Sequence, residues 1–339
     1  QPDKYFLDDK QVNRINSSLT INVDVSKALE LKVNKNKSFQ GIIPVGKGFY
    51  IDERQAQSWI TQDNQNKNVL KQSCSADDLT DNPHGNPCRW IIDFNDMCLE
   101  DASDYKLPFE HLKNTVKPER DNNRDSKAKQ YWWKFLRSRP AMRKAIDNLS
   151  HYFIVPRHSK WFIFLPAYNN WLPADSTIVV TSDDYYILGI LTSNIHRLWV
   201  KAQSSTLKGD TRYTNTTCFE TFPFPQNPRK GVSRTAPTSR NVPTGIIVEQ
   251  IRNKTIELHQ YRTEQMSKKQ WGITQLYNAY FHEPASKLYQ LHQELDKLVM
   301  QAYNFKADDD ILAKLLELNS EVAAKEKRGE KVIGAESPY

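Results

Sequence analysis

The pattern of hydrophobic and polar positions changes character near residue 225. Before that point, short apolar runs alternate with polar turns, and four runs are predicted to be strands, at residues 151–156, 161–166, 176–181 and 185–191. A short helix is predicted from Ile195 to Ala202, with Ile195, Leu198 and Trp199 on one side. Several strands that alternate with short helices are typical of an α+β domain, which we expect to end at Pro225.

The first part of the chain contains further elements of both kinds. Residues 39–51 indicate two strands around a glycine turn, which predicts a hairpin. Residues 52–61 place apolar side chains on one stripe behind Asp52, a plausible N-cap, and predict a helix. The remaining elements expected here are a buried strand at residues 90–94 and helical segments at residues 97–109 and 109–117, interrupted at Pro108 and Pro118.

Beyond residue 225 the sequence first becomes a linker and then helical. Residues 226–243 are rich in Pro, Ser, Thr and Arg and almost lack large apolar side chains. Apolar residues then recur at helical spacing over residues 246–266, 284–303 and 308–327. The sequence therefore predicts an α+β fold, with a mixed-sheet domain over residues 1–225, a linker over residues 226–243 and a small all-helical C-terminal domain over residues 244–339.

Charge adds a candidate binding surface. The net charge is +7, but the segment from Lys113 to Lys144 alone holds eleven lysines and arginines against three carboxylates. Tyr131, Trp132 and Trp133 lie within it, and basic groups mixed with aromatic ones suit a surface that neutralises phosphates. The alternative is that the tryptophans belong to the core and the charges only coat a helix. Both can hold, with Trp inward and the basic face outward.

Cysteine content and hydropathy limit the class of protein. Four cysteines are too few for a disulfide framework in 339 residues, so a reducing, cytoplasmic setting is expected. Cys74, Cys88 and Cys98 flank His84 without a paired C-x-x-C, which favours free buried thiols over a zinc site. No apolar run approaches eighteen residues, so no membrane partner is expected. Because the chain lacks an initiator Met, it is expected to be a piece of a longer polypeptide.

Catalytic motifs are hard to find. No glycine-rich loop after a strand suits S-adenosylmethionine, and no Asn/Asp-Pro-Pro-aromatic element is present. Gly46-Lys47-Gly48 lacks the spacing of a phosphate loop, and the nearest carboxylate clusters, Asp183-Asp184 and residues 110–113, are weak candidates for a metal nuclease. On residues alone the chain is predicted to be a non-catalytic binding module.

One short stretch carries a more specific signal. Lys208, Asp210 and Arg212 alternate, so in an extended segment their side chains point the same way. A Lys, an Asp and an Arg on one face can read acceptor and donor edges of bases in a DNA major groove. The alternative is a surface strand with a solvated charge stripe. The Pro-rich aromatic run at residues 218–225 behind them cannot be helical and predicts a stiff exit from the domain.

Taken in order, a series of short motifs resembles the target recognition domain and C-terminal helical domain of type IIL (MmeI-like) restriction–modification enzymes and related N6-adenine DNA methyltransferases. The matching pieces are Tyr5-Phe6-Leu7-Asp8, Phe39-Gln40-Gly41, Gly46-Lys47-Gly48-Phe49, Trp90-Ile91-Ile92-Asp93-Phe94, Val116-Lys117-Pro118-Glu119-Arg120, Trp132-Trp133, Arg139-Pro140, Arg212-Tyr213, Cys218-Phe219-Glu220-Thr221-Phe222-Pro223-Phe224-Pro225, Leu276-Tyr277-Asn278 and Leu295-Asp296. Their order and spacing span nearly the whole chain.

The resemblance implies that the chain is the recognition end of a larger enzyme. In that family a base-reading pair lies two residues apart just ahead of the Arg-Tyr element, which places it on Lys208 and Asp210, with Arg212 following. Such a pair suits a G·C base pair, Lys to guanine and Asp to cytosine. Family members split between this Phe-Glu-Thr-Phe-Pro-Phe-Pro ending and other endings, and this chain has the former.

The function expected from the resemblance is recognition of a specific sequence in double-stranded DNA for an adenine-N6 methyltransferase domain of the same polypeptide. S-adenosylmethionine is expected in that domain and no cofactor in this chain. The residues expected to contact the DNA backbone are Lys117, Arg120, Arg124, Lys127, Arg137, Arg139, Arg143, Arg157 and Lys160. The alternative function is a structural or protein-interaction subunit with a basic face.

Overall fold

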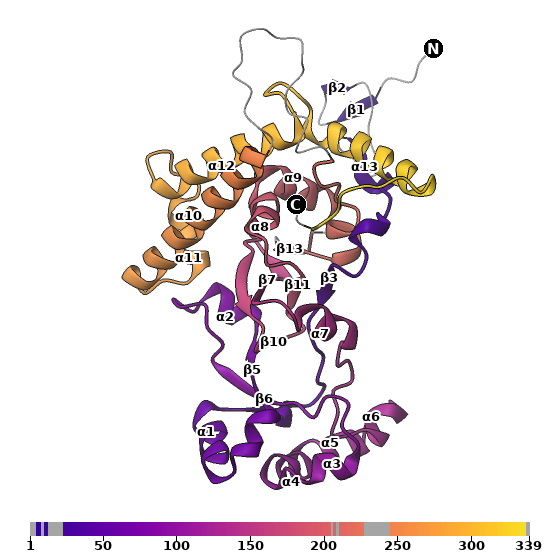
Figure 1. Ribbon diagram of the computed structural model, residues 1–339, viewed down its shortest axis with the longest axis vertical. Coiled ribbons are helices and arrows are strands. Elements are labelled where there is room, and N and C mark those ends of the chain that lie inside the picture. The colour runs from indigo at the N-terminus through magenta and orange to yellow at the C-terminus, as the bar shows by residue number, and fades with distance from the viewer. Residues whose placement is uncertain are drawn as a thin grey trace.

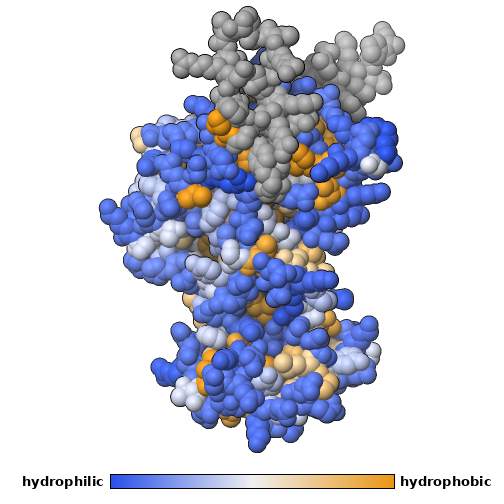
Figure 2. Space-filling view, in the orientation of Figure 1, coloured by the Kyte–Doolittle hydropathy of each residue, from blue (hydrophilic) through white to orange (hydrophobic). Residues whose placement is uncertain are grey.

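The computed structural model describes residues 5–7, 10–12, 23–204, 206–207, 210–226 and 245–336. Mixed sheets occupy the middle of the molecule and long helices follow them, which confirms the α+β class. Figure 1 shows a lower lobe of short helices, two central sheets and an upper layer formed by the C-terminal helices. In the space-filling view a narrower waist separates the lower lobe from the rest (Figure 2).

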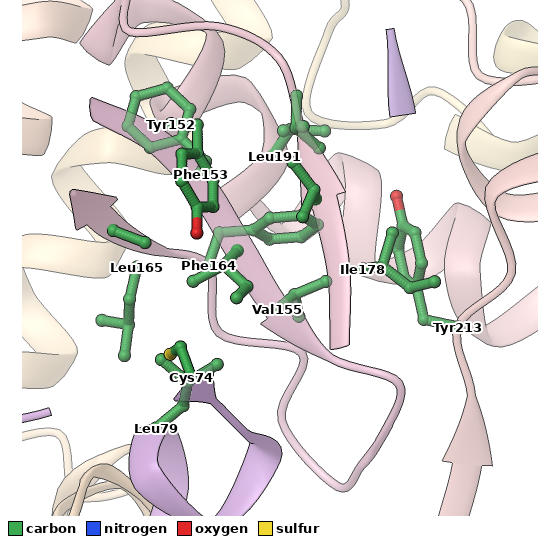
Figure 3. Close-up of a cluster of buried hydrophobic side chains, with 14 of the residues drawn as sticks. Cys74, Leu79, Tyr152, Phe153, Val155, Phe164, Leu165, Ile178, Leu191 and Tyr213 are labelled. Carbon is green, nitrogen blue, oxygen red and sulfur yellow. The ribbon is translucent and has the colours of Figure 1, made fainter. Parts of the chain in front are cut away.

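The central sheet is antiparallel and buried. Its strand order is β3-β11-β7-β9, with Val179 paired to both Phe39 and Ile154. Tyr152 and Val155 of β7 are fully buried, and Figure 3 shows their side chains among those of neighbouring strands and helices. The strands span Ser38–Gln40 (β3), His151–Pro156 (β7), Leu165–Tyr168 (β9) and Thr177–Val180 (β11). The predictions at 151–156 and 176–181 are confirmed.

The strand predicted at residues 161–166 begins later, at Leu165. Phe162 has a φ of 47°, which an extended strand cannot contain. Trp161 and Phe164 are nonetheless buried, so the run is apolar because it packs, not because it is a strand.

The second sheet is mixed, in the order β10-β5-β6-β4, with β10 parallel to β5 and the other pairs antiparallel. Its strands are Tyr50–Ile51 (β4), Leu70–Cys74 (β5), Arg89–Ile92 (β6) and Trp171–Pro173 (β10). The strand predicted at residues 90–94 is confirmed as β6. The hairpin predicted at residues 39–51 is wrong, because β3 and β4 belong to different sheets. Between them Gly41 passes so close to residues 173–174 that a Cβ atom would lie 2.1 Å from the carbonyl oxygen of Ala174.

The lower lobe is built from short helices. The helix predicted at residues 52–61 is α1, capped by Asp52, whose side chain accepts from the amide of Gln55 at 2.8 Å. Pro108 does not interrupt a helix: it lies in the first turn of α4, where its missing N–H costs nothing. The helices here are Glu53–Gln62 (α1), Leu99–Ser103 (α3), Lys106–Thr115 (α4), Lys117–Asp121 (α5) and Ser126–Gln130 (α6), with Ala76–Thr80 (α2) and Pro140–Ile146 (α7) nearer the sheets.

The strand predicted at residues 185–191 is wrong, because this run forms helix α8 (Tyr185–Thr192). Asp184 caps it, accepting from the amide of Tyr186 at 2.8 Å. Residues 186–192 are all buried, so the run has no polar face that would have revealed a helical period. The next helix, α9 (Asn194–Gln203), is confirmed where it was expected.

The C-terminal helices are α10 (Gly245–Lys269), α11 (Ile273–Tyr280), α12 (Lys287–Tyr303) and α13 (Ile311–Lys327). Three of them match the predicted helices. Asp310 is the N-cap of α13, as expected for a helix that begins after acidic residues. Helix α10 packs against both α8 and α12. At Gly189 on α8 a Cβ atom would lie 2.4 Å from the hydroxyl of Thr255 on α10, so the two helices touch. The linker expected at residues 226–243 lies almost wholly outside the described residues, and the domain boundaries remain a prediction.

The aromatic run at residues 218–225 is not an exit from the fold but part of its core. Phe222 and Phe224 are buried, and the amide of Asn34 donates to the Phe222 carbonyl at 2.8 Å. Tyr303 on α12 donates to the Pro223 carbonyl at 2.9 Å. The run therefore joins the N-terminal segment to the C-terminal helices.

No helix in the described parts of the chain is long and apolar enough to cross a membrane. Among the described residues, which include all four cysteines, no group of three or more histidine, cysteine or carboxylate side chains is arranged to hold a metal ion. Cys74 and Cys218 are buried free thiols, whereas Cys88 and Cys98 are exposed, so the expectation of buried thiols is wrong for these two.

Candidate nucleic-acid interface

A small three-stranded sheet positions Arg212. Its order is β12-β13-β8, formed by Thr206–Leu207, Asp210–Arg212 and His158–Ser159. Arg212 pairs with His158 in register, and its side chain is exposed. The next residue, Tyr213, is fully buried beside Ile178 (Figure 3), and its hydroxyl lies 3.2 Å from Nε2 of His196. The alternation of a buried tyrosine and an exposed arginine fixes the outward direction of Arg212.

Arg157 lies beside this strand, at the end of β7. Its backbone amide donates to Ser176 at 2.8 Å, and its carbonyl oxygen accepts from the amide of Tyr213, also at 2.8 Å. These two bonds fix the backbone of Arg157 between the turn before β11 and strand β13. They thereby hold Arg157 next to Arg212, although the two residues are 55 positions apart in the sequence.

Two more arginines reach the same place from the segment before α7. Arg137 is exposed and pairs by its backbone with Ile43. Arg139 adopts a left-handed conformation, with φ of 57°, which is uncommon for a residue with a side chain. Its Nε donates to the carbonyl of Gly41 at 3.1 Å, and its Nη2 donates to Oε1 of Gln40 at 3.1 Å. The side chain is therefore anchored at the end of β3.

Arg137, Arg139, Arg157 and Arg212, here called the arginine cluster, are close enough to affect one another. Burial first, and then the charge of Arg212, lowers the pKa of Arg157. Burial, followed by the charges of Arg137 and Arg157, lowers the pKa of Arg139. Asp175 is the acidic residue that opposes both effects. Four like charges beside one carboxylate repel each other in the free protein and suit a polyanion that would relieve the repulsion.

The structure describes the three residues expected to read bases to different extents. Lys208 lies outside the described residues. Asp210 is the first residue of strand β13, which agrees with the extended segment that was predicted, but its side chain is not described. Arg212 is exposed and belongs to the arginine cluster. Neither the base-reading role of Lys208 and Asp210 nor that of Arg212 is tested by these contacts.

Two arginines expected at the DNA backbone turn inward instead. Arg120 is 1% exposed, and its guanidinium donates to the carbonyls of Pro44, Val45, Tyr131 and Lys134. Arg143 forms a bidentate ion pair with Asp93, at 2.7 and 3.1 Å, and also donates to the carbonyl of Ser138. Both guanidinium groups form hydrogen bonds within the fold, so the expectation that they contact phosphate is wrong.

The other expected backbone contacts are distributed over the surface. Lys117 is half-buried and paired with Asp121 at 2.8 Å on helix α5, and Arg124 and Lys127 are exposed nearby. Figure 1 places α5 and α6 in the lower lobe, apart from β13. Lys160 is exposed, lies over the ring of Trp161 and bonds to Asn278 at 3.2 Å. The basic segment 113–144 therefore does not form one face: Trp132 and Trp133 are core, as the alternative held, and its arginines diverge.

Sequence reasoning missed the residues that shape the cluster. Gln40 links Arg139 to the turn before β11, because its side chain also donates to the carbonyl of Asp175 at 2.9 Å. Asp175 itself acts on Tyr50, whose pKa is raised by burial and by this carboxylate, and Arg89 lies over the Tyr50 ring at 5.1 Å. Only the meeting of β3, β10 and β11 reveals this arrangement, and no local motif encodes it.

The glycines and carboxylates once considered for chemistry have structural roles. A Cβ atom at Gly48 would lie 2.2 Å from Oγ1 of Thr115, so this glycine allows close packing on α4. Asp184 caps α8 and pairs with Arg252, and Glu110 pairs with Lys113.

Comparison with known proteins decides how to interpret the surface. The sequence model of the MmeI target recognition domain matches residues 20–226, which is more than half of the chain. The chain belongs to the MmeI target recognition domain family. The matched range of this target recognition domain contains the whole arginine cluster, strand β13 and the buried run at residues 218–225. Helices α10–α13 follow it.

Two similar proteins extend the comparison. DNA methyltransferase A of Bacillus subtilis (strain 168) is 31% identical over 150 residues, which are 42% of this chain and 14% of that protein. The structure of the type IIL restriction–modification enzyme MmeI in complex with DNA has a TM-score of 0.70 and 18% sequence identity, and the match covers 93% of this chain and 39% of that one. The second likeness shows that the fold is shared. The chain spans only a minor part of either protein.

Proposed function

We propose that the chain recognises a specific sequence in double-stranded DNA for a restriction–modification methyltransferase that modifies adenine at N6. The methyltransferase domain, with its S-adenosylmethionine, would lie in the same polypeptide outside this chain. Membership of the target recognition family supports the recognition role. The solved relative binds DNA, and the sequence relative is a DNA methyltransferase.

The arginine cluster is the observation that carries the proposal. Three segments far apart in the sequence bring Arg137, Arg139, Arg157 and Arg212 together, opposed by the carboxylate of Asp175. Arginine donates to phosphate in a planar fork, which fixes register on a DNA backbone. Strand β13, which contains Asp210 and ends in Arg212, would then lie against the groove beside those phosphates.

Specificity would come from Asp210, at the start of β13, together with Lys208, which lies outside the described residues. We propose that Lys208 and Asp210 read one base pair, which the chemistry of the two groups favours as G·C, with Lys on guanine and Asp on cytosine N4. Arg212 would add either a base contact or a phosphate contact next to them. Loss of one good bidentate base contact costs about 1–3 kcal/mol of discrimination.

The salt dependence of binding tests the proposal. Duplex DNA should bind the chain with a log Kd that changes linearly with log salt concentration, and four phosphate contacts predict a slope magnitude of about 4. An acidic protein of similar charge should bind more weakly at the same salt. If the acidic protein bound and duplex DNA did not, the chain would be an interaction subunit with a basic face instead.

A further inference from the structure

A partly open cavity lies at the start of β7, the end of the strand away from the arginine cluster. His151 is the first residue of β7 and Arg157 follows its last, so the two are separated by about 20 Å of strand. The cavity measures about 400 Å³ and is lined by residues from the loop after α2, from α10 and from strands β7 and β9. Its size is that of a small-molecule site. The proposed DNA surface makes no use of it.

Six rings line this cavity, which we call the ring pocket, and besides His84 they are Trp171, Tyr168, His151, Tyr185 and His259. These five form a continuous series. Trp171 and Tyr168 have ring centroids 5.1 Å apart, and Tyr168 is the cross-strand partner of His151. His151 is 5.5 Å from Tyr185, which in turn is 6.3 Å from His259. An arc of aromatic faces and edges is the environment that planar heterocycles prefer.

Burial favours the neutral form of two imidazoles in the ring pocket, those of His151 and His259. Burial, with the charges of Arg262 and His151, lowers the pKa of His259 to about 3, and burial lowers the pKa of His151. Each neutral imidazole offers one donor and one acceptor. Buried Nδ1 of His259 and Nε2 of His151 have no hydrogen-bond partner among the described residues. No lining residue is a carboxylate. The pocket is therefore suited to a neutral ligand that has both donors and acceptors on its edge.

A buried arginine behind the wall favours acceptors in particular. Arg262 lies one turn along α10 from His259 and is fully buried. Its Nη1 donates to the hydroxyl of Tyr277 at 3.1 Å, but its Nε and Nη2 have no partner among the described residues. Its charge reaches both His259 and Tyr185 on the pocket wall. A positive potential at the wall disfavours cations and favours ring carbonyls or ring nitrogens.

A second, more open hollow of about 560 Å³ adjoins the ring pocket across Asn86, Tyr168 and Trp171. It adds the amides of Gln72, Asn169 and Asn170. Amide side chains can bond to hydroxyl groups or phosphate oxygens of whatever is attached to the ring. The two spaces together match a planar base with a polar substituent.

We propose that the ring pocket binds a nucleobase, with the attached sugar in the adjoining hollow. The base is either that of a free nucleoside or nucleotide, or one extruded from a nucleic acid. It stacks on the arc formed by Trp171, Tyr168 and the histidines, and its edge bonds to the neutral imidazoles. This site is independent of the arginine cluster.

Titration with the four common nucleosides, followed by ligand-observed NMR and calorimetry, tests the proposal. Tyr168 is 62% exposed, so Tyr168→Ala removes a stacking surface with little effect on folding, and it should weaken binding about ten-fold or more. Thr263→Trp fills the pocket from an exposed position on α10 and should abolish binding. Glu264→Trp, at the neighbouring exposed position outside the pocket, is the matched control and should bind as the unaltered chain does.

A second arm uses a duplex that contains one bulged 2-aminopurine, whose fluorescence reports a change in stacking. An extruded base is the ligand if three results are found together. The fluorescence response is lost in Thr263→Trp, it is retained at saturating duplex in the double variant Arg157→Ala/Arg212→Ala, and nucleosides do not bind. Binding of nucleosides identifies a free one. The proposal is overturned if neither probe binds, if binding survives both Tyr168→Ala and Thr263→Trp, or if glucose binds in place of nucleosides.

Discussion

The backbone amide of Tyr213 donates to the carbonyl oxygen of Arg157 at 2.8 Å. Because the Tyr213 ring is fully buried, this bond ties Arg157 to the core and places it beside Arg212. The fold thus holds two like charges together that would separate if they were free to do so. A surface that maintains such repulsion is suited to a polyanionic partner.

Arg157→Ala and Arg212→Ala should each weaken binding to duplex DNA and reduce the magnitude of the salt slope by about 1. Neither change should lower stability, because each removes a like-charge contact. Fluorescence anisotropy with labelled duplexes at several salt concentrations measures the slope. Arg328→Ala is the matched control, since Arg328 is exposed at the end of α13 and paired with Glu330. An unchanged slope in both cluster variants would remove them from the interface.

Arg120→Met should destabilise the fold by about 3 kcal/mol or more, because it leaves several carbonyl oxygens of the lower lobe without a donor. Arg124→Met, at an exposed position four residues away, should stay within about 0.5 kcal/mol of the unaltered chain. Urea unfolding measures both. Equal effects of the two substitutions would mean that Arg120 is not the buried support described here.

Stability should fall as pH drops below about 6.5. Burial lowers the pKa of His196 and of His259 to about 3, and it lowers that of His292 well below its ordinary value. The unfolded chain, with ordinary histidines, then binds more protons than the folded one between about pH 6.5 and 3, so acid favours unfolding. Each such histidine contributes about 1.4 kcal/mol per pH unit in that window and nothing above it.

Unfolding free energies measured from pH 8 to pH 5 check this sign. Below pH 6.5, His259→Gln should reduce the slope of unfolding free energy against pH by the contribution of one histidine. Above pH 7 the unfolding free energy of this variant should not change with pH. A stability that is constant from pH 8 to 5, or that rises on acidification, would contradict the burial of these rings.

Gly189→Ala should destabilise the protein by about 2 kcal/mol or more, although alanine is the better helix former by about 1 kcal/mol. The added methyl group would meet Thr255 and Ile251 on α10, at 2.4 and 2.6 Å. Thermal unfolding measures the loss. A gain in stability would show that α8 and α10 do not pack this closely, and that the C-terminal helices are attached more loosely than the structure has them.

Local patterns predicted the elements that have a polar face. Helices α10, α12 and α13 have an apolar stripe against solvent-exposed positions, and Asp310 provides a sequence signal for the start of α13. Helix α8 has no such contrast, because burial of Tyr186 through Thr192 removes the period that separates a helix from a strand. The supposed hairpin failed for another reason: the path of Gly41 is set by residues 173–174, which no local rule reaches.

The types of residue in the candidate site could be predicted from the sequence, but the positions at which they come together in the fold could not. Charge selected Arg120 and Arg143 along with Arg137 and Arg139, and charge alone cannot distinguish a guanidinium that caps internal carbonyls from one at the surface. Backbone pairing between segments far apart in the sequence is what separates the surface arginines from the internal ones. The pairing of β13 with β8, and that of residue 43 with Arg137, are what assemble the cluster.

Selection of bound duplexes from a random-sequence pool tests the central claim most directly. The unaltered chain should enrich one DNA motif, and the double substitution Lys208→Glu/Asp210→Arg should change the base preferred at one position of that motif while the others persist. Enrichment of no motif, or an unchanged motif with affinity lowered equally for every sequence, would contradict recognition of a base pair by the start of β13.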